Sequence, residues 1–159
     1  MILYLKTTRR GSVFYKKEMV KLPALSDVTL WRTFSLFSFC RDFVTNNNTA
    51  ASPVSWRDLF LRFLPALINV ARGDIRFVGV SPRTIEEINA LPVDWQSLYL
   101  KSKAGIVTEA LVNFGPVTTE DELYSAETIY AVSAGWKYDF MILVKYFGQV
   151  LGVLPLPGK

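Results

Sequence analysis

The chain has 159 residues, of which half are hydrophobic and 20% are charged, with a formal net charge of +4. It contains no histidine and one cysteine, Cys40, which excludes histidine-based catalysis, histidine zinc sites and intrachain disulfides. Any nucleophilic or acid–base chemistry must therefore come from Asp, Glu, Lys, Tyr, Ser or the one thiol. The length suits one domain, and we expect a single domain over residues 1–159.

Charge is distributed unevenly along the chain. Residues 1–73 contain 11 Lys and Arg against 4 Asp and Glu, whereas residues 74–159 contain 7 against 10. The basic part suits an anionic lipid, a nucleotide phosphate or nucleic acid, although a solvated basic face explains the same excess. No stretch reaches the roughly 20 apolar residues that span a bilayer. The apolar runs 28–40 and 140–157 are each interrupted by one basic residue and suit a membrane interface.

Residues 1–56 predict short extended segments and loops. Val13–Tyr15 favours a strand, Leu22–Asp27 a loop, and the aromatic run Trp31–Phe39 either a strand or an interfacial helix. The sequence NNNTAASP at Asn46–Pro53 predicts a flexible loop.

Residues 57–159 show helical patterns with one short extended segment. Apolar residues recur at helical spacing over Arg57–Arg72, with Gly73 as the stop, and Pro65 inside this range implies a kink or a helix start nearby. Ile75–Val80 favours a strand or an extended segment. Capping residues predict the remaining helix starts, at Thr84 with Glu87, Asp94, Thr119 with Glu122, and Asp139. The fold class is therefore α+β, mostly helical, with a small β element and amphipathic interfacial helices.

One block resembles a known family. Leu64–Gly79 reads LPALINVARGDIRFVG and closely resembles the LPQL-NV--GDMS-VGPRP signature of bacterial sugar transferases, the monotopic polyprenyl-phosphate phosphoglycosyl transferases. Ala104–Thr108 resembles the family's PGITG and Gly11–Tyr15 its GPVFY. An acidic residue, a tyrosine and an aspartate of the family correspond to Glu127, Tyr130 and Asp139. Residues 57–159 match best, and residues 1–56 are divergent.

The resemblance implies a reaction and a place for it. Such enzymes transfer a sugar 1-phosphate from a nucleotide diphosphate sugar to a polyprenyl phosphate, at the cytoplasmic face of the bacterial inner membrane. An aspartate of an Asp–Glu pair attacks the β-phosphate, Mg²⁺ neutralises the diphosphate, and arginines hold phosphate oxygens. A carboxylate is a nucleophile at neutral pH, so this chemistry needs no histidine. The expected partners are a nucleotide sugar, a polyprenyl phosphate, a membrane surface and, as an open alternative, further copies of the chain. No nucleic-acid motif is present, so we expect no nucleic-acid partner.

The chain departs from the family at the acidic residues. The family's SLDELPQ corresponds to Phe60–Ala66, in which both acids are replaced, and we expect the place of the family's N-terminal membrane helix to lie before Met1. The acids between the aromatic segment and Leu64 are Asp42 and Asp58, and Asp58 suits a helix cap. Asp42 is therefore the candidate nucleophile and Mg²⁺ ligand, with a solvated loop aspartate as the alternative.

Three arginines are candidate phosphate ligands. Ser81-Pro82-Arg83 corresponds to the family's PRP, so Arg83 is the first, with a surface arginine as the alternative. Arg57 matches a family arginine near the same pocket, and Arg72 lies inside the best-matching block, where it also suits a helix C-terminus. Two other hypotheses stay open: a catalytically inactive homologue that acts as a scaffold or regulator of polysaccharide assembly, and a fragment of a longer transferase.

Overall fold

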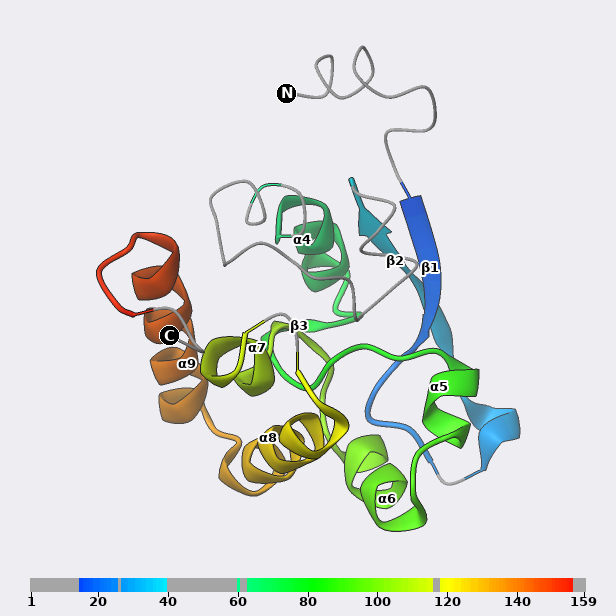
Figure 1. The fold of residues 1–159 in the computed structure, drawn as a ribbon. Helices are drawn as coiled ribbons and strands as arrows, with labels where there is room; N and C mark the ends of the chain where they lie inside the picture. The colour runs from blue at the N-terminus through cyan, green and yellow to red at the C-terminus, as the bar shows by residue number, and fades with distance from the viewer. Residues whose placement is uncertain (1–14, 26, 40–59, 61–62, 116–117, 156–159) are drawn as a thin grey trace.

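The computed structural model describes residues 15–25, 27–39, 60, 63–115 and 118–155. Within them the chain folds into short strands and a larger number of helices, which confirms the α+β class with a small β element (Figure 1). No helix in these ranges is both long and apolar enough to cross a membrane. The loop predicted at Asn46–Pro53 lies outside the described residues.

The elements follow one another in chain order with short connections. The strands are β1 (Tyr15–Val20), β2 (Thr33–Ser38), β3 (Arg76–Val78) and β4 (Gly105–Val107). A 3₁₀ turn, η1 (Val28–Leu30), lies between β1 and β2. The helices are α4 (Leu64–Ala71), α5 (Ile85–Asn89), α6 (Val93–Lys101), α7 (Glu109–Asn113), α8 (Glu120–Ser133) and α9 (Trp136–Val150).

The aromatic run after residue 30 forms a strand and not an interfacial helix. β2 pairs with β1 in an antiparallel ribbon in which Met19 faces Phe34 and Lys17 faces Leu36. Burial alternates along β2, as expected for a strand with one face on a core. Asn69 of α4 is fully buried, donates to the Ser35 carbonyl at 2.8 Å and accepts from the Phe37 amide at 3.4 Å. This amide attaches α4 to the edge of β2 and satisfies backbone groups that the ribbon leaves open.

Two glycines bring the central strands into contact. β3 and β4 pair in parallel, and the pairing continues through the bridge between Val80 and Ala104. A Cβ on Gly79 would overlap the Lys103 carbonyl oxygen and the Gly105 amide nitrogen, and a Cβ on Gly105 would overlap Gly79. Because the opposing atoms are backbone, neither side can move away easily. Both glycines belong to segments that resemble the family's motifs, and this close crossing is their structural reason.

The helix predicted over Arg57–Arg72 is described from its C-terminal part. Pro65 lies in the first turn of α4, which confirms the prediction that it marks a helix start. Gly73 follows with φ +72°, the left-handed conformation expected for a residue that ends a helix. Residues 57–59, 61 and 62 lie outside the described residues, and Arg57 is among them.

Two predicted capping boxes are confirmed and two predicted helix starts are shifted. Thr84 with Glu87 caps α5, and Thr119 with Glu122 caps α8, with both reciprocal bonds present in each case. Pro92 is the N-cap of α6, so Asp94 lies in the first turn of that helix and is not its cap. Gly135 is the N-cap of α9, so the last helix begins at Trp136 and Asp139 lies in its first turn. In both shifted cases an acid in the first turn interacts favourably with the helix dipole. In the sequence alone, an acid at this position looks the same as an N-cap residue.

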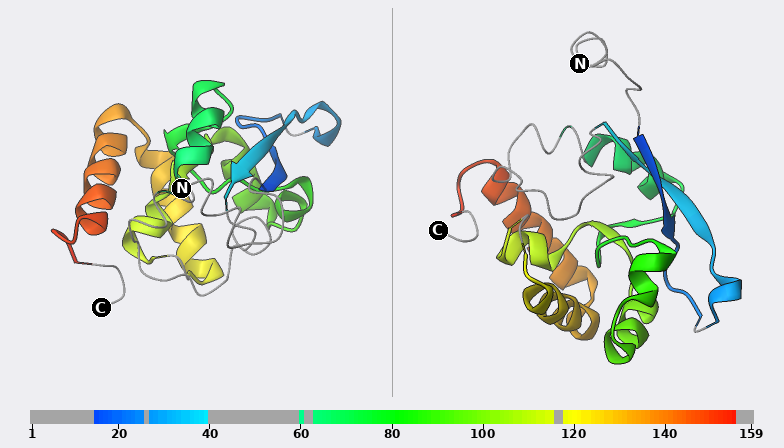
Figure 2. Two further views of the ribbon diagram at one scale, coloured as in Figure 1. Left: turned by 90° about the horizontal axis from the view of Figure 1, so that it is seen from above. Right: turned by 45° about the vertical axis from the view of Figure 1, so that its right-hand side comes forward.

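The core lies between the β1–β2 ribbon and α9, which occupy opposite sides of the molecule with β3 between them (Figure 2). α9 buries Ile142, Tyr146, Gln149 and Val150. Its outer face carries Trp136, Phe140, Met141, Val144 and Leu151, each more than half exposed. The apolar residues of this helix thus serve two faces, and the predicted broad face is divided between core and surface.

Candidate functional site

Arg83 lies in a closed polar network in the interior. Its side chain is 7% exposed, and its Nη1 donates to Oε2 of Glu127 at 2.8 Å, across from the loop after β3 to α8. The Trp95 indole N–H donates to the same Glu127 oxygen at 2.7 Å, and the Ser81 amide donates to Oε1 at 3.3 Å. Glu127 is therefore satisfied on both oxygens, as a buried carboxylate must be.

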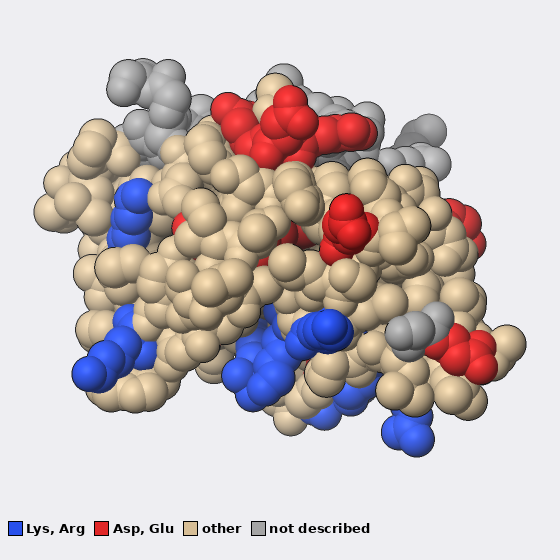
Figure 3. Space-filling model, turned by 90° about the horizontal axis from the view of Figure 1, so that it is seen from below, with Lys and Arg blue, Asp and Glu red and all other residues tan. Residues whose placement is uncertain are grey.

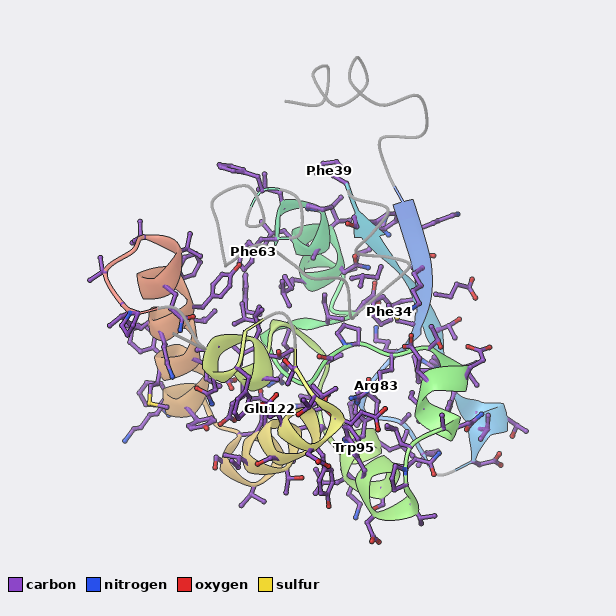
Figure 4. The ribbon with its side chains drawn as sticks, in the orientation of Figure 1. Phe34, Phe39, Phe63, Arg83, Trp95 and Glu122 are labelled. Carbon is purple, nitrogen blue, oxygen red and sulfur yellow. The ribbon has the colours of Figure 1, made fainter. Side chains whose placement is uncertain are left out.

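Aromatic rings enclose the Arg83 guanidinium. Its central carbon lies 5.0 Å from the centre of the Trp95 ring and 4.6 Å from that of Tyr99, and Figure 4 shows Arg83 and Trp95 side by side. Tyr99 donates through its hydroxyl to the Ser81 carbonyl at 2.7 Å, and its burial raises the pKa of the phenol. Ser81, Arg83, Trp95, Tyr99 and Glu127, here called the Arg83 network, connect the loop after β3 to α6 and α8.

One donor of the Arg83 network has no partner. Arg83 Nη2 is buried without a hydrogen bond among the described residues. Glu127 already accepts from Nη1, and Nη2 is a buried donor without a partner that suits a phosphate oxygen. The role of Arg83 as a phosphate ligand stays a prediction, and in this geometry a phosphate must enter a closed interior to reach it.

An aromatic cluster occupies the start of α4, where the family has acids. Phe63, which corresponds to the glutamate of SLDELPQ, precedes α4 and lies between that helix and α9 in Figure 4. Its ring centre is 6.2 Å from that of Phe77, 6.5 Å from Tyr146 and 6.0 Å from Phe147. Among the described residues, the position that carries a carboxylate in the family therefore carries an apolar ring packed between β3 and α9.

An open cleft lies beside β3. It has a volume of about 750 Å³ and is bounded by the end of α4, by β3, by the residues before β4 and by the first turns of α9. Each of these four segments contributes one charged side chain, namely Asp74, Arg76, Lys103 and Asp139. Trp136 and Phe140 form an aromatic wall. We call this feature the α9 cleft.

The carboxylates of the α9 cleft have partners of their own. Asp74 accepts from Lys21 Nζ at 3.0 Å, and Asp139 accepts from the Tyr130 hydroxyl at 3.0 Å. The Tyr130 hydroxyl also lies 3.2 Å from the Val78 carbonyl. Burial, with the charge of Asp139 beside it, raises the pKa of Tyr130, so the phenol stays a neutral donor. The tyrosine and aspartate that match the family thus form a bonded pair that fixes α9 to α8 and β3.

The predicted site residues do not come together in the described part of the chain. Asp42 and Arg57 lie outside it. Arg72 is the exposed C-cap of α4, with its guanidinium 5.6 Å from the Phe37 ring of β2, whereas Arg83 contacts α6 and α8. Sequence reasoning did not single out Arg76 or Lys103, although each immediately precedes or lies within a family-like block.

Metal ligation has little support among the described residues. No group of three or more Asp, Glu, Cys or His side chains in these ranges is arranged to hold a metal ion. Asp74 and Asp139 face one cleft, but the first is paired with a lysine and the second with a tyrosine. We therefore derive no step through Mg²⁺ from these residues, and the metal stays a prediction attached to Asp42.

Comparison with known protein families gives the chain its class. The family model of bacterial sugar transferases matches residues 1–153, which is nearly the whole chain. The protein therefore belongs to the bacterial sugar transferase family, whose members associate with membranes. A search among curated proteins found none that matches the chain.

Proposed function

We propose that the protein transfers a sugar 1-phosphate from a nucleotide diphosphate sugar to a polyprenyl phosphate, as the first step of exopolysaccharide or related glycan synthesis. The observation that carries this proposal is the family match over residues 1–153, which supports a sugar transferase in general. The glycine crossing of β3 and β4 and the Tyr130–Asp139 pair add support, because they give structural reasons for motif residues far apart in the chain.

In this proposal Asp42 is the nucleophile. Its carboxylate oxygen attacks the β-phosphorus of the donor, the bond to the bridging oxygen breaks, and the nucleoside monophosphate leaves with that electron pair. A phosphate oxygen of the polyprenyl phosphate then attacks the same phosphorus and releases Asp42. Mg²⁺, if it binds at Asp42, supplies charge neutralisation for the diphosphate. Arg57, Arg72 and Arg83 stay predicted phosphate ligands.

We place the protein peripherally on the cytoplasmic face of the inner membrane. The outer face of α9 supports a membrane contact, because Trp136 is 76% and Phe140 64% exposed and two lysines, Lys137 and Lys145, lie on the same helix. An amphipathic helix of this kind lies in the interface with its apolar side buried and its lysines near anionic headgroups.

The transfer reaction is tested with membranes from cells that express the natural open reading frame. Radiolabelled nucleotide sugars are supplied with polyprenyl phosphate, and radioactivity in the organic phase is measured. We expect a lipid-linked product that Asp42→Asn abolishes and that Asp58→Asn, the matched carboxylate in the same stretch, retains. No product with any donor, or full activity of Asp42→Asn, contradicts the proposed reaction.

A second function, an inactive scaffold of polysaccharide assembly, has one specific observation in its favour. The packing of Phe63 against Phe77, Tyr146 and Phe147 fills with rings a position that is acidic in the family. If the protein is a scaffold, deletion of its gene reduces polysaccharide output, and the Asp42→Asn protein restores the output fully.

A further inference from the structure

The α9 cleft contains two cations that form no ion pair among the described residues. Arg76 and Lys103 are both exposed and line the cleft from β3 and from the residues before β4. No carboxylate of the described residues forms an ion pair with either of them, whereas Asp74 has Lys21. Asp139 is engaged by Tyr130 at one oxygen. The Tyr130 hydroxyl is neutral, so Asp139 keeps its charge. With Lys21 counted against Asp74, the two cations Arg76 and Lys103 outweigh the one carboxylate Asp139 and the cleft keeps a positive charge.

Basic and acidic side chains are unevenly distributed on the surface of the molecule. In the face shown in Figure 3, most lysines and arginines gather toward one edge, and the largest group of acidic side chains lies at the opposite edge. An anion that approaches this face is attracted to the basic edge, since unpaired surface charges attract counter-ions over about 8–10 Å at moderate salt.

Exposed aromatic rings also line the cleft, and apolar residues continue from them along α9. Trp136 and Phe140 line the cleft and are 76% and 64% exposed, far more than packing against the core requires. Met141, Val144 and Leu151 continue the exposed apolar side of α9 beyond the cleft. A ligand with an anionic end and a long apolar part therefore finds both features in sequence, first the cations and then the helix face.

The polar part of the lining is charged. No serine, threonine, asparagine, glutamine or tyrosine of the described residues lines the cleft, and its cations are Arg76 and Lys103. Two unpaired cations match the terminal phosphate of a monoester, which carries a charge of about −1.5 to −2 at neutral pH. An arginine fork and a lysine point charge are complementary ways to hold it.

We propose that the α9 cleft binds the terminal phosphate of a lipid phosphomonoester, held by Arg76 and Lys103, with the apolar chain laid along Trp136 and Phe140. This inference rests on the proposed function for one point only, that polyprenyl phosphate is the natural ligand. The site places the lipid beside the Tyr130–Asp139 pair.

The test is flotation of the full chain with phosphatidylcholine vesicles that contain phosphatidic acid, a phosphomonoester, or phosphatidylglycerol, a phosphodiester, at equal surface charge. We expect tighter binding to phosphatidic acid, and Arg76→Gln and Lys103→Gln to weaken it about fivefold each. Lys101→Gln, an exposed lysine that does not line the cleft, is the matched control. Arg76→Lys is expected to restore most of the binding, and Asp139→Asn to tighten it, because a negative charge leaves the mouth while an acceptor for Tyr130 stays.

Several results overturn the proposal. Equal binding to the two anionic vesicles shows that the protein does not distinguish a phosphomonoester from a phosphodiester. Equal losses of binding in Arg76→Gln, Lys103→Gln and the Lys101→Gln control show that general surface charge, and not the cleft, causes the binding. If a nucleoside diphosphate competes with the vesicles and this competition depends on Arg76 and Lys103, the cleft binds the nucleotide. If inorganic phosphate binds as tightly as the lipid, the apolar chain contributes nothing to binding. A chain without transferase activity that still selects phosphatidic acid through these residues overturns the proposed function and leaves this site in place.

Discussion

The Arg83 network and the α9 cleft contain the same kinds of residue and use them differently. Each combines an arginine, a carboxylate and a tryptophan. In the Arg83 network the arginine and the carboxylate are paired inside the protein and enclosed by rings. In the α9 cleft the arginine is exposed without an ion-pair partner among the described residues, and the tryptophan faces outward. The comparison teaches that pairing and enclosure, rather than residue type, separate a charge that holds the fold from one available to a ligand.

The largest loss of stability is expected when the Arg83 network loses its carboxylate, Glu127. Glu127→Ala leaves the Arg83 guanidinium buried without its counter-ion, which should lower the free energy of unfolding by about 3–5 kcal/mol. Urea unfolding measures it, with Glu120→Ala at the exposed start of the same helix as the control. If the two variants are equally stable, the Arg83 network does not hold the fold.

A substitution at the close contact of β3 and β4 should lower the stability of the protein nearly as much. Gly79→Ala forces a methyl group onto backbone atoms of Lys103 and Gly105, so β3 and β4 must part, at a cost of about 1–3 kcal/mol. Gly135→Ala is the control, because its nearest neighbour would be the Ser133 carbonyl oxygen at 3.8 Å. Thermal unfolding of both variants checks the difference, and a larger loss in Gly135→Ala contradicts the account of the crossing.

A substitution in the α9 cleft should change membrane binding and not the stability of the fold. Phe140→Asp puts a charge on the outer face of α9 and should weaken flotation with anionic vesicles about tenfold or more, the equivalent of one apolar ring no longer buried. Val132→Asp on α8, at a position 82% exposed, controls for an added acid on an apolar surface site. Equal flotation of the two variants removes the membrane role from this helix face.

A smaller effect is expected from a buried carboxylate between α7 and α9. Burial raises the pKa of Glu109 above its usual value, although Tyr138 and Asn113 donate to it, and its Oε2 has no partner among the described residues. The folded protein therefore holds this proton to higher pH than the unfolded chain, so stability falls as pH rises above the usual carboxyl range. Glu109→Gln should flatten this decline in urea midpoints measured across that range, and an unchanged or steeper slope contradicts it.

The sequence predicted the elements that depend on local chemistry. The capping boxes of α5 and α8, Gly73 after α4, and the extended segment at β3 could be predicted because each follows from residues within a few positions. The starts of α6 and α9 were misplaced because an acid in a first turn resembles a cap. The two faces of α9 could not be separated, because one helix packs on the core and carries exposed apolar residues.

The site was harder to predict than the fold. Arg83 was recognised as a special arginine from its motif, but its partners come from α6 and α8, 12 to 44 residues further along the chain, and no local pattern announces them. Arg76 and Lys103 share a cleft only because β3 and β4 lie side by side. Such long-range pairings depend on tertiary structure, whereas motif residues such as Gly79 could be picked out by resemblance alone.

The most direct test of the contrast between the two regions is a residue-resolved titration. A soluble short-chain lipid phosphomonoester is added to the ¹⁵N-labelled full chain, and amide shifts are followed by NMR. We predict saturable shifts at Arg76, Phe77, Lys103 and Trp136, with Ser81, Arg83 and Glu127 unchanged. Shifts centred on Ser81 and Arg83, with the α9 cleft silent, contradict the account and make Arg83 the phosphate ligand.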